Sequence, residues 1–135
     1  TTTTTAPPTT TTTAPPTTTT TAPPTTTTTT AASPTTIELN VTTHGTVPPY
    51  YSFKNAAGNS ITTLQSSNQY TFTSNDTGLN PHPLIFQEGT GIAITGDNPL
   101  RAGGTTNIAF TSGSSSLGWN CAIHSNTMVG LIPIS

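Results

Sequence analysis

The first 36 residues of this chain are built almost entirely from threonine, alanine and proline, and they contain a repeat. The octapeptide TTTTTAPP occurs three times without a mismatch in residues 1–24, and a degenerate copy, TTTTTTAASP, fills residues 25–34. No side chain in this tract is large and apolar, so burial cannot offset its ordering entropy, and the paired prolines exclude a helix. The pattern predicts an extended, polyproline-like stalk over residues 1–36, followed by a single domain over residues 37–135.

Threonine combined with proline is also typical of O-glycosylated stalks. We expect sugars on the repeat threonines, with Thr1, Thr9 and Thr17 as the first residue of each perfect copy. Asn40 and Asn75 each stand two positions before a threonine and form sequons for N-glycosylation. Together these features predict a glycoprotein that is extracellular or exposed on a cell or virion surface.

Charged side chains make up only 4% of the chain, and the formal net charge is −2. No basic stripe is available to neutralise phosphates, so nucleic-acid binding is not expected. No apolar stretch approaches the roughly 20 residues of a membrane-spanning helix, so no membrane span is expected either. Little repulsion opposes contact between copies of such a chain, and the composition therefore favours self-association.

After Pro34 the pattern changes to short runs in which apolar and polar residues alternate between turn-forming segments. Period two dominates, and no helical period competes with it. Many short strands at this spacing predict an all-β fold, either a β-sandwich or a Greek-key barrel. The predicted strands are Ile37–Thr42, Tyr50–Lys54, Ser60–Leu64, Gln69–Thr73, Pro83–Gln87, Gly91–Thr95, Thr106–Thr111, Leu117–Cys121 and Val129–Ile134.

Residues that bind soft metals gather near the C-terminus. Cys121, His124 and Met128 lie within eight positions, and His82 stands at the start of another predicted strand. Two imidazoles, one thiolate and a weak axial thioether form the ligand set of blue-copper sites. If Cys121 ends one strand and Val129 begins the next, the loop between them presents three ligands at one end of the sandwich, and His82 can complete the site.

The spacing C-x-x-H-x-x-x-M, followed by Val129, Gly130 and an apolar last strand, resembles the copper loop of the cupredoxins. The segment HPLIFQ at residues 82–87 is similar to the strand that carries their first histidine. The resemblance covers residues 37–135 and implies a Greek-key β-sandwich. It also implies one type 1 copper ion, with His82 and His124 as imidazole ligands, Cys121 as thiolate and Met128 as axial ligand.

One position departs from the cupredoxin pattern. Many cupredoxins carry an asparagine directly after the first histidine, and that side chain hydrogen-bonds to the cysteine loop. This chain has Pro83 there, so the contacts around the ligands are expected to differ.

Other residues and motifs support no competing chemistry. His44 has no partner at ligand spacing and is predicted to be a surface loop residue, and Trp119 is predicted to pack in the core. No nucleophile elbow and no phosphate-binding loop before a helix are present, so we do not expect an enzyme.

Two classes of function compete for this chain. The repeat has no use in diffusional electron transfer, and repetition suits elongated structures. We therefore expect a filament or surface subunit in which copper is a property of the domain. The alternatives are a secreted one-electron carrier that docks on a redox partner protein, and a surface copper-binding module for scavenging or sensing.

Overall fold

A computed structural model describes residues 1–14, 33–111 and 113–135. The chain divides into two units, Thr1–Ala31 and Ala32–Ser135. Residues 1–14 are exposed and contain no regular secondary structure. The last two residues of the second copy, the whole third copy with Thr17, and most of the degenerate copy lie outside the described residues.

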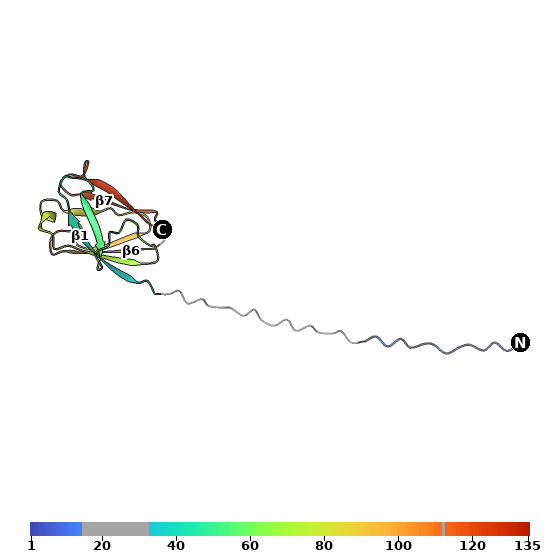
Figure 1. Cartoon of the computed structure of the whole chain (residues 1–135). Helices are drawn as coiled ribbons and strands as arrows, with labels where there is room; N and C mark the ends of the chain where they lie inside the picture. The colour runs from blue at the N-terminus through green and yellow to red at the C-terminus, as the bar shows by residue number, and fades with distance from the viewer. Residues whose placement is uncertain (15–32, 112) are drawn as a thin grey trace. The chain divides into compact units, whose positions relative to one another are not determined.

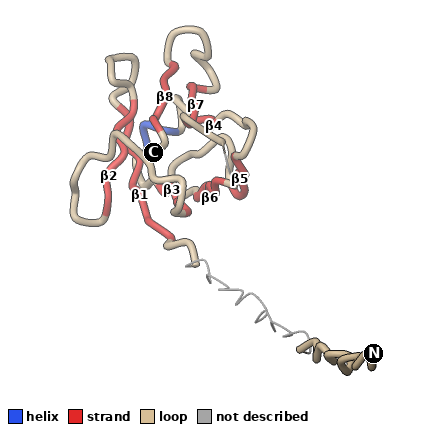
Figure 2. The backbone as a smooth tube through the Cα atoms, turned by 90° about the vertical axis from the view of Figure 1, so that its right-hand side faces the viewer, coloured by secondary structure: helices blue, strands red, loops and turns tan. Residues whose placement is uncertain are grey.

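The second unit is all-β and contains two sheets (Figure 1). A five-stranded sheet has the order β2-β1-β3-β6-β5, and a three-stranded sheet has the order β4-β7-β8 (Figure 2). The one short helix of the described residues is the 3-10 turn η1, Thr77–Leu79. The strands are β1 Thr36–Thr43, β2 Tyr51–Asn55, β3 Gln69–Thr73, β4 Leu84–Phe86, β5 Ile92–Gly96, β6 Thr105–Phe110, β7 Ser116–Cys121 and β8 Val129–Pro133.

Eight of the nine predicted strands are confirmed, with ends that agree or shift by one residue. The strand predicted at Ser60–Leu64 is wrong. Ser60 forms an isolated bridge to Lys54 beside β2, whereas Leu64 forms one to Ile134 just after β8. The segment thus crosses from the edge of one sheet to the edge of the other, and it has no continuous ladder with either.

The five-stranded sheet is mixed. β1 pairs antiparallel with β2 but parallel with β3, whereas β6 pairs antiparallel with both β3 and β5. The three-stranded sheet is antiparallel throughout. No helix among the described residues is long and apolar enough to span a membrane.

Side chains from both sheets meet in one core, which makes the fold a β-sandwich. On β3, Tyr70 and Phe72 are buried on the inner face, as the alternation predicts. Phe72 packs against Phe86 of the three-stranded sheet, with ring centroids 4.5 Å apart. The same layer contains Phe53, which contacts Phe72, Phe86 and Trp119.

Candidate metal centre

All four predicted metal ligands flank strands of the three-stranded sheet. His82 lies two residues before β4, and Cys121 is the last residue of β7. His124 and Met128 lie in the loop that connects β7 to β8. Because Leu84 of β4 pairs with Cys121, the antiparallel ladder brings the start of β4 to the end of β7. Sheet register therefore determines where His82 and Cys121 meet.

The loop after Cys121 is held by backbone hydrogen bonds at both of its ends. The Cys121 N–H donates to the Met128 carbonyl at 2.9 Å, and the Met128 N–H donates to the His124 carbonyl at 2.9 Å. The Ala122 N–H donates to the Pro83 carbonyl at 2.8 Å, which ties the loop to the segment that carries His82. The loop is thus fixed to its neighbour through the backbone alone, a connection that needs no asparagine after His82.

Three of the predicted ligands converge. The Cys121 Sγ lies 3.6 Å from the Nδ1 of His124 and 3.9 Å from the Nδ1 of His82. One ligand atom from each of these residues lies within 4.8 Å of the others. The two imidazole rings are 5.1 Å apart at their centroids and tilted by 31°.

These separations fit a bound metal ion. With bonds of roughly 2.3 Å to sulfur and 2.0 to 2.1 Å to nitrogen, and angles of about 120°, each sulfur–nitrogen separation would be about 3.8 Å. The observed 3.6 and 3.9 Å lie on either side of that value. His82, Cys121 and His124 can therefore hold a metal ion with little movement of their side chains.

The ligand atoms differ in their access to solvent. Cys121 is completely buried and Met128 nearly so, whereas the two histidines are half-buried. Cys121 is the single cysteine of the chain and is free of any disulfide. The thiol thus lies beneath two imidazoles that reach the surface.

Tyr51, the first residue of β2, also touches the site, although it belongs to the other sheet. Its hydroxyl donates to the His82 carbonyl at 2.8 Å, and its ring packs edge-on against Trp119 with centroids 5.3 Å apart. Burial, followed by the hydrogen bond and charge of the neighbouring Cys121 thiol, raises the pKa of Tyr51 well above its usual value. Tyr51 therefore links the five-stranded sheet to the segment that carries His82.

The turn before β2 sets the position of Tyr51. Tyr50 adopts a left-handed backbone conformation with φ of 62°, which is unfavourable for a residue with a Cβ. Bonds from the Tyr50 N–H to the Val47 carbonyl and from the His44 N–H to the Tyr50 carbonyl, at 2.9 and 2.6 Å, hold this conformation. Sequence reasoning missed Tyr51, because nothing local in the chain relates it to a histidine 31 positions away.

The other predicted residues lie away from the metal centre. His44 is exposed, as predicted, and its Nε2 lies 3.3 Å from the Ser52 Oγ. Trp119 is buried in the core, as predicted. The residues predicted to carry sugars are exposed where the structure describes them, namely Thr1, Thr9, Asn40 and Asn75.

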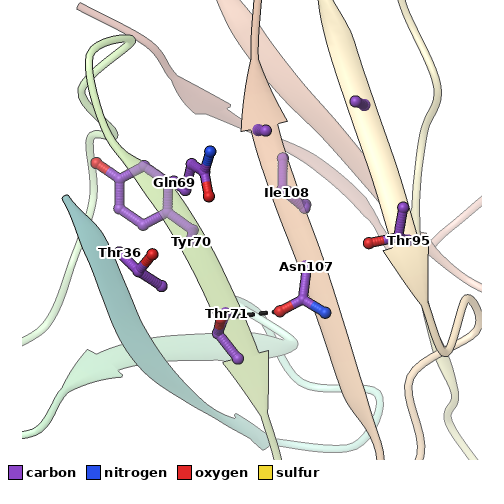
Figure 3. Close-up of a pocket in the computed structure, with 9 residues that line it drawn as sticks. Thr36, Gln69, Tyr70, Thr71, Thr95, Asn107 and Ile108 are labelled. Carbon is purple, nitrogen blue, oxygen red and sulfur yellow. Dashed lines mark hydrogen bonds between the residues drawn. The ribbon is translucent and has the colours of Figure 1, made fainter. Parts of the chain in front are cut away.

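Two hollows occur elsewhere on the domain. Figure 3 shows the first, of about 230 Å³, on the five-stranded sheet. It is lined mainly by small and polar side chains, and the Thr71 hydroxyl donates to the Asn107 Oδ1 there at 2.9 Å. The second is an apolar cleft of about 330 Å³ between β2 and β8, lined by Tyr51, Trp119 and Leu131 among others. Neither hollow is lined by a charged residue or by a predicted metal ligand.

Comparison with known proteins identifies no relative. No protein-family model, curated protein or solved structure matches this chain. Functional inference therefore depends on the residues and the geometry of the site.

Proposed function

We propose that this chain is a subunit of an extracellular filament or surface structure, built from a copper-binding, cupredoxin-like Greek-key domain and a glycosylated Thr/Pro stalk. The observation that carries the copper assignment is the convergence of His82, Cys121 and His124 on one point. The chemistry of these donors favours copper, since a thiolate with two imidazoles suits its soft and borderline states.

The roles of the ligands follow from their chemistry. Cys121 binds as a thiolate, and each histidine binds as a neutral imidazole through Nδ1, the nitrogen that faces the sulfur. Met128 would be the fourth, weaker donor, as the resemblance to cupredoxins implies. Copper held in this way supplies a one-electron couple. Tyr51 orients the His82 segment through its hydrogen bond to the carbonyl.

The proposal of a filament is supported by the composition of the chain. A tract of 36 residues without a large apolar side chain has no stabilising partner within itself. Ordering it would cost on the order of 1 kcal/mol or more per residue, so an ordered stalk would need sugars or neighbouring subunits to hold it. Head-to-tail contacts whose rotation does not close into a ring propagate as a fibre.

The copper assignment is tested by the visible spectrum of the copper-loaded protein. We expect an intense thiolate-to-copper band that Cys121→Ser abolishes and Met128→Leu only shifts. Both variants should keep the far-ultraviolet circular dichroism of the wild type. A colourless protein that binds zinc in preference to copper would overturn the assignment.

The filament assignment is tested by deletion of residues 1–36. The full chain should form fibres in electron micrographs, and the shortened chain should stay monomeric by light scattering while still binding one copper ion. Intact mass should exceed the 13.8 kDa of the polypeptide by hexose-sized steps. A full-length protein that is monodisperse, with a mobile tract by NMR, would contradict this function.

A soluble electron carrier is the second candidate, and one surface feature favours it. Ile123, next to His124, is 65% exposed and provides an apolar contact surface beside a half-buried ligand. Pro83, next to His82, and Met128 are buried and add nothing to this surface. A monodisperse copper protein with fast electron self-exchange would favour this candidate over the filament.

A further inference from the structure

The strand β8 has an open edge. In an antiparallel ladder, successive residues direct their N–H and C=O groups to alternate sides. The Met128 carbonyl and the Ile134 N–H bond toward β7, at 2.9 and 2.8 Å, so Val129, Leu131 and Pro133 face away from it. The Pro133 carbonyl accepts from the Leu64 N–H at 2.8 Å. Within the described residues, the backbone groups of Val129 and Leu131 have no partner on that side.

The edges at β2 and β4 are covered. Beside β2, the Ile61 N–H donates to the Phe53 carbonyl at 2.8 Å. Beside β4, the Asn98 side chain bonds to both the N–H and the carbonyl of Phe86 at 2.9 Å, as a paired strand would. Exposed strand edges are normally protected in this way, because they are sites for the addition of another strand.

The edge at β5 is only slightly open. The Ile92 N–H bonds to the Gly89 carbonyl at 3.1 Å, and the strand ends at Gly96, whose φ is 86°. Among the residues within β5 whose backbone groups point away from β6, this leaves Ile94 open, and its side chain is half-buried. Among the four edges, β8 therefore offers the longest open ladder.

The open edge of β8 also carries apolar side chains. Leu131 is 68% exposed and Val129 is 48% exposed, and no charged residue lies in the strand. Directly beside it is the apolar cleft of about 330 Å³, in which Tyr51, Trp119 and Ile132 contribute to the lining. A strand added to β8 would place alternate side chains over this cleft and close the gap between the two sheets.

We propose that β8 accepts, as an added strand, one five-threonine segment from the stalk of a second copy of this chain. This inference rests on the proposed filament and names its contact surface. Threonine has high strand propensity, and a run of five threonines is long enough to pair along the open positions from Val129 to Leu131. Pro8 directly precedes the segment Thr9–Thr13, and Pro15 follows it after Ala14; prolines cannot donate to a ladder, so pairing ends within about one residue of the segment. Neither the segment Thr9–Thr13 nor β8 contains a charged residue, so no electrostatic repulsion opposes their contact.

Strand pairing divides the threonines into two sets. With Thr9, Thr11 and Thr13 on the outer face, Thr10 and Thr12 point into the cleft, because side chains alternate along a strand. A sugar fits only on the outer face. Glycosylation at the first threonine of each copy is thus compatible with docking, and Thr10 and Thr12 carry no sugar in the fibre.

Disulfide trapping tests this contact in the full-length chain. Single variants Thr11→Cys and Leu131→Cys are mixed, oxidised and digested, and the linked peptides are identified by mass spectrometry. Residues held in contact react at a high effective concentration, so the 11–131 link should exceed that from a Thr11→Cys and Val47→Cys mixture by more than roughly tenfold. Val47 is a matched control, since it is 64% exposed but lies outside the edge. Equal yields, or 131–131 links in place of 11–131 links, would overturn the proposal.

A charge on the edge provides the second test. Leu131→Lys should raise the concentration needed for fibre formation by at least about tenfold, whereas Val47→Lys should leave it unchanged. Thermal unfolding checks that both variants are folded. If deletion of residues 1–36 abolishes the fibres and Leu131→Lys does not, the filament stands and the β8 contact is wrong. If fibres survive both changes, the stalk-dependent filament itself is wrong.

Discussion

The two sheets of the domain divide its physical tasks. The five-stranded sheet supplies many of the buried aromatic side chains, among them Phe53, Tyr70 and Phe72, and has no predicted metal ligand. The three-stranded sheet is smaller, but all four predicted ligands lie at the ends of its strands. Tyr51 reaches from the large sheet to a ligand segment through its hydrogen bond to the His82 carbonyl. Stability and metal chemistry should therefore be separable by mutation.

Phe72→Ala is expected to have the largest effect on stability. Phe72 is fully buried and contacts Phe53, Tyr70 and Phe86, so its removal should lower the free energy of unfolding by about 3–5 kcal/mol. Urea denaturation of the metal-free protein measures the loss. Under conditions in which the variant is folded, it should still bind one copper ion. Weakened copper binding in the folded variant would show that the sheets do not act separately.

The control for that experiment lies on the same sheet. Thr95 of β5 is exposed, so Thr95→Ala should change the free energy of unfolding by no more than about 0.5 kcal/mol.

Gly130→Ala tests how tightly the three-stranded sheet is packed. Gly130 pairs with Trp119 across the β7–β8 ladder, and a Cβ there would overlap the indole ring. Overpacking should cost about 1–3 kcal/mol and change the fluorescence of the single tryptophan. Gly118→Ala is the matched control on β7, where the added Cβ would meet the flexible side chain of Gln87. Equal losses in the two variants would contradict this packing account.

Tyr51→Phe should have a smaller effect on stability than Phe72→Ala or Gly130→Ala, and the most specific effect on the site. Loss of the hydrogen bond to the His82 carbonyl should cost about 1 kcal/mol. Because that bond positions the His82 segment, the visible band or the reduction potential of the copper-loaded protein should shift. A merely structural tyrosine would give the loss of stability without the spectral shift.

The pH dependence of the same variant provides a control in the metal-free protein. Burial and the nearby thiol raise the pKa of Tyr51, so it keeps its proton in the folded state when the unfolded chain ionises near pH 10. Stability is therefore complete below about pH 10 and falls as the pH rises further. Tyr51→Phe should reduce the steepness of that fall.

Most of the strands could be predicted from the sequence, because apolar and polar residues alternate along a strand that buries one of its faces. In β1, for example, Leu39 and Val41 are buried between exposed or half-buried neighbours. The prediction of a strand at Ser60–Leu64 was wrong because the two ends of this segment bridge to different sheets, although its composition resembles that of a strand. The parallel pairing of β1 with β3 was also not predictable, since strand order depends on long-range packing that no local pattern contains.

The candidate ligands were predictable because three of them share a short loop with fixed spacing. Their convergence with His82 depended on the register of β4 and β7, which sequence could suggest but not establish. Tyr51 was beyond prediction, because its approach to the site depends on the turn at Tyr50 and on the packing of two sheets.

The burial of Cys121 also determines how fast the thiol can react. A small metal ion can pass between the half-buried rings of His82 and His124, and partly exposed side chains change rotamer within picoseconds to nanoseconds. A bulky thiol reagent cannot follow that route to a sulfur with 0% exposure. Its labelling rate in the metal-free protein is then limited by opening of the end of β7. The labelling rate of the single cysteine thus reports local unfolding at the metal centre, and a bound metal should lower that rate.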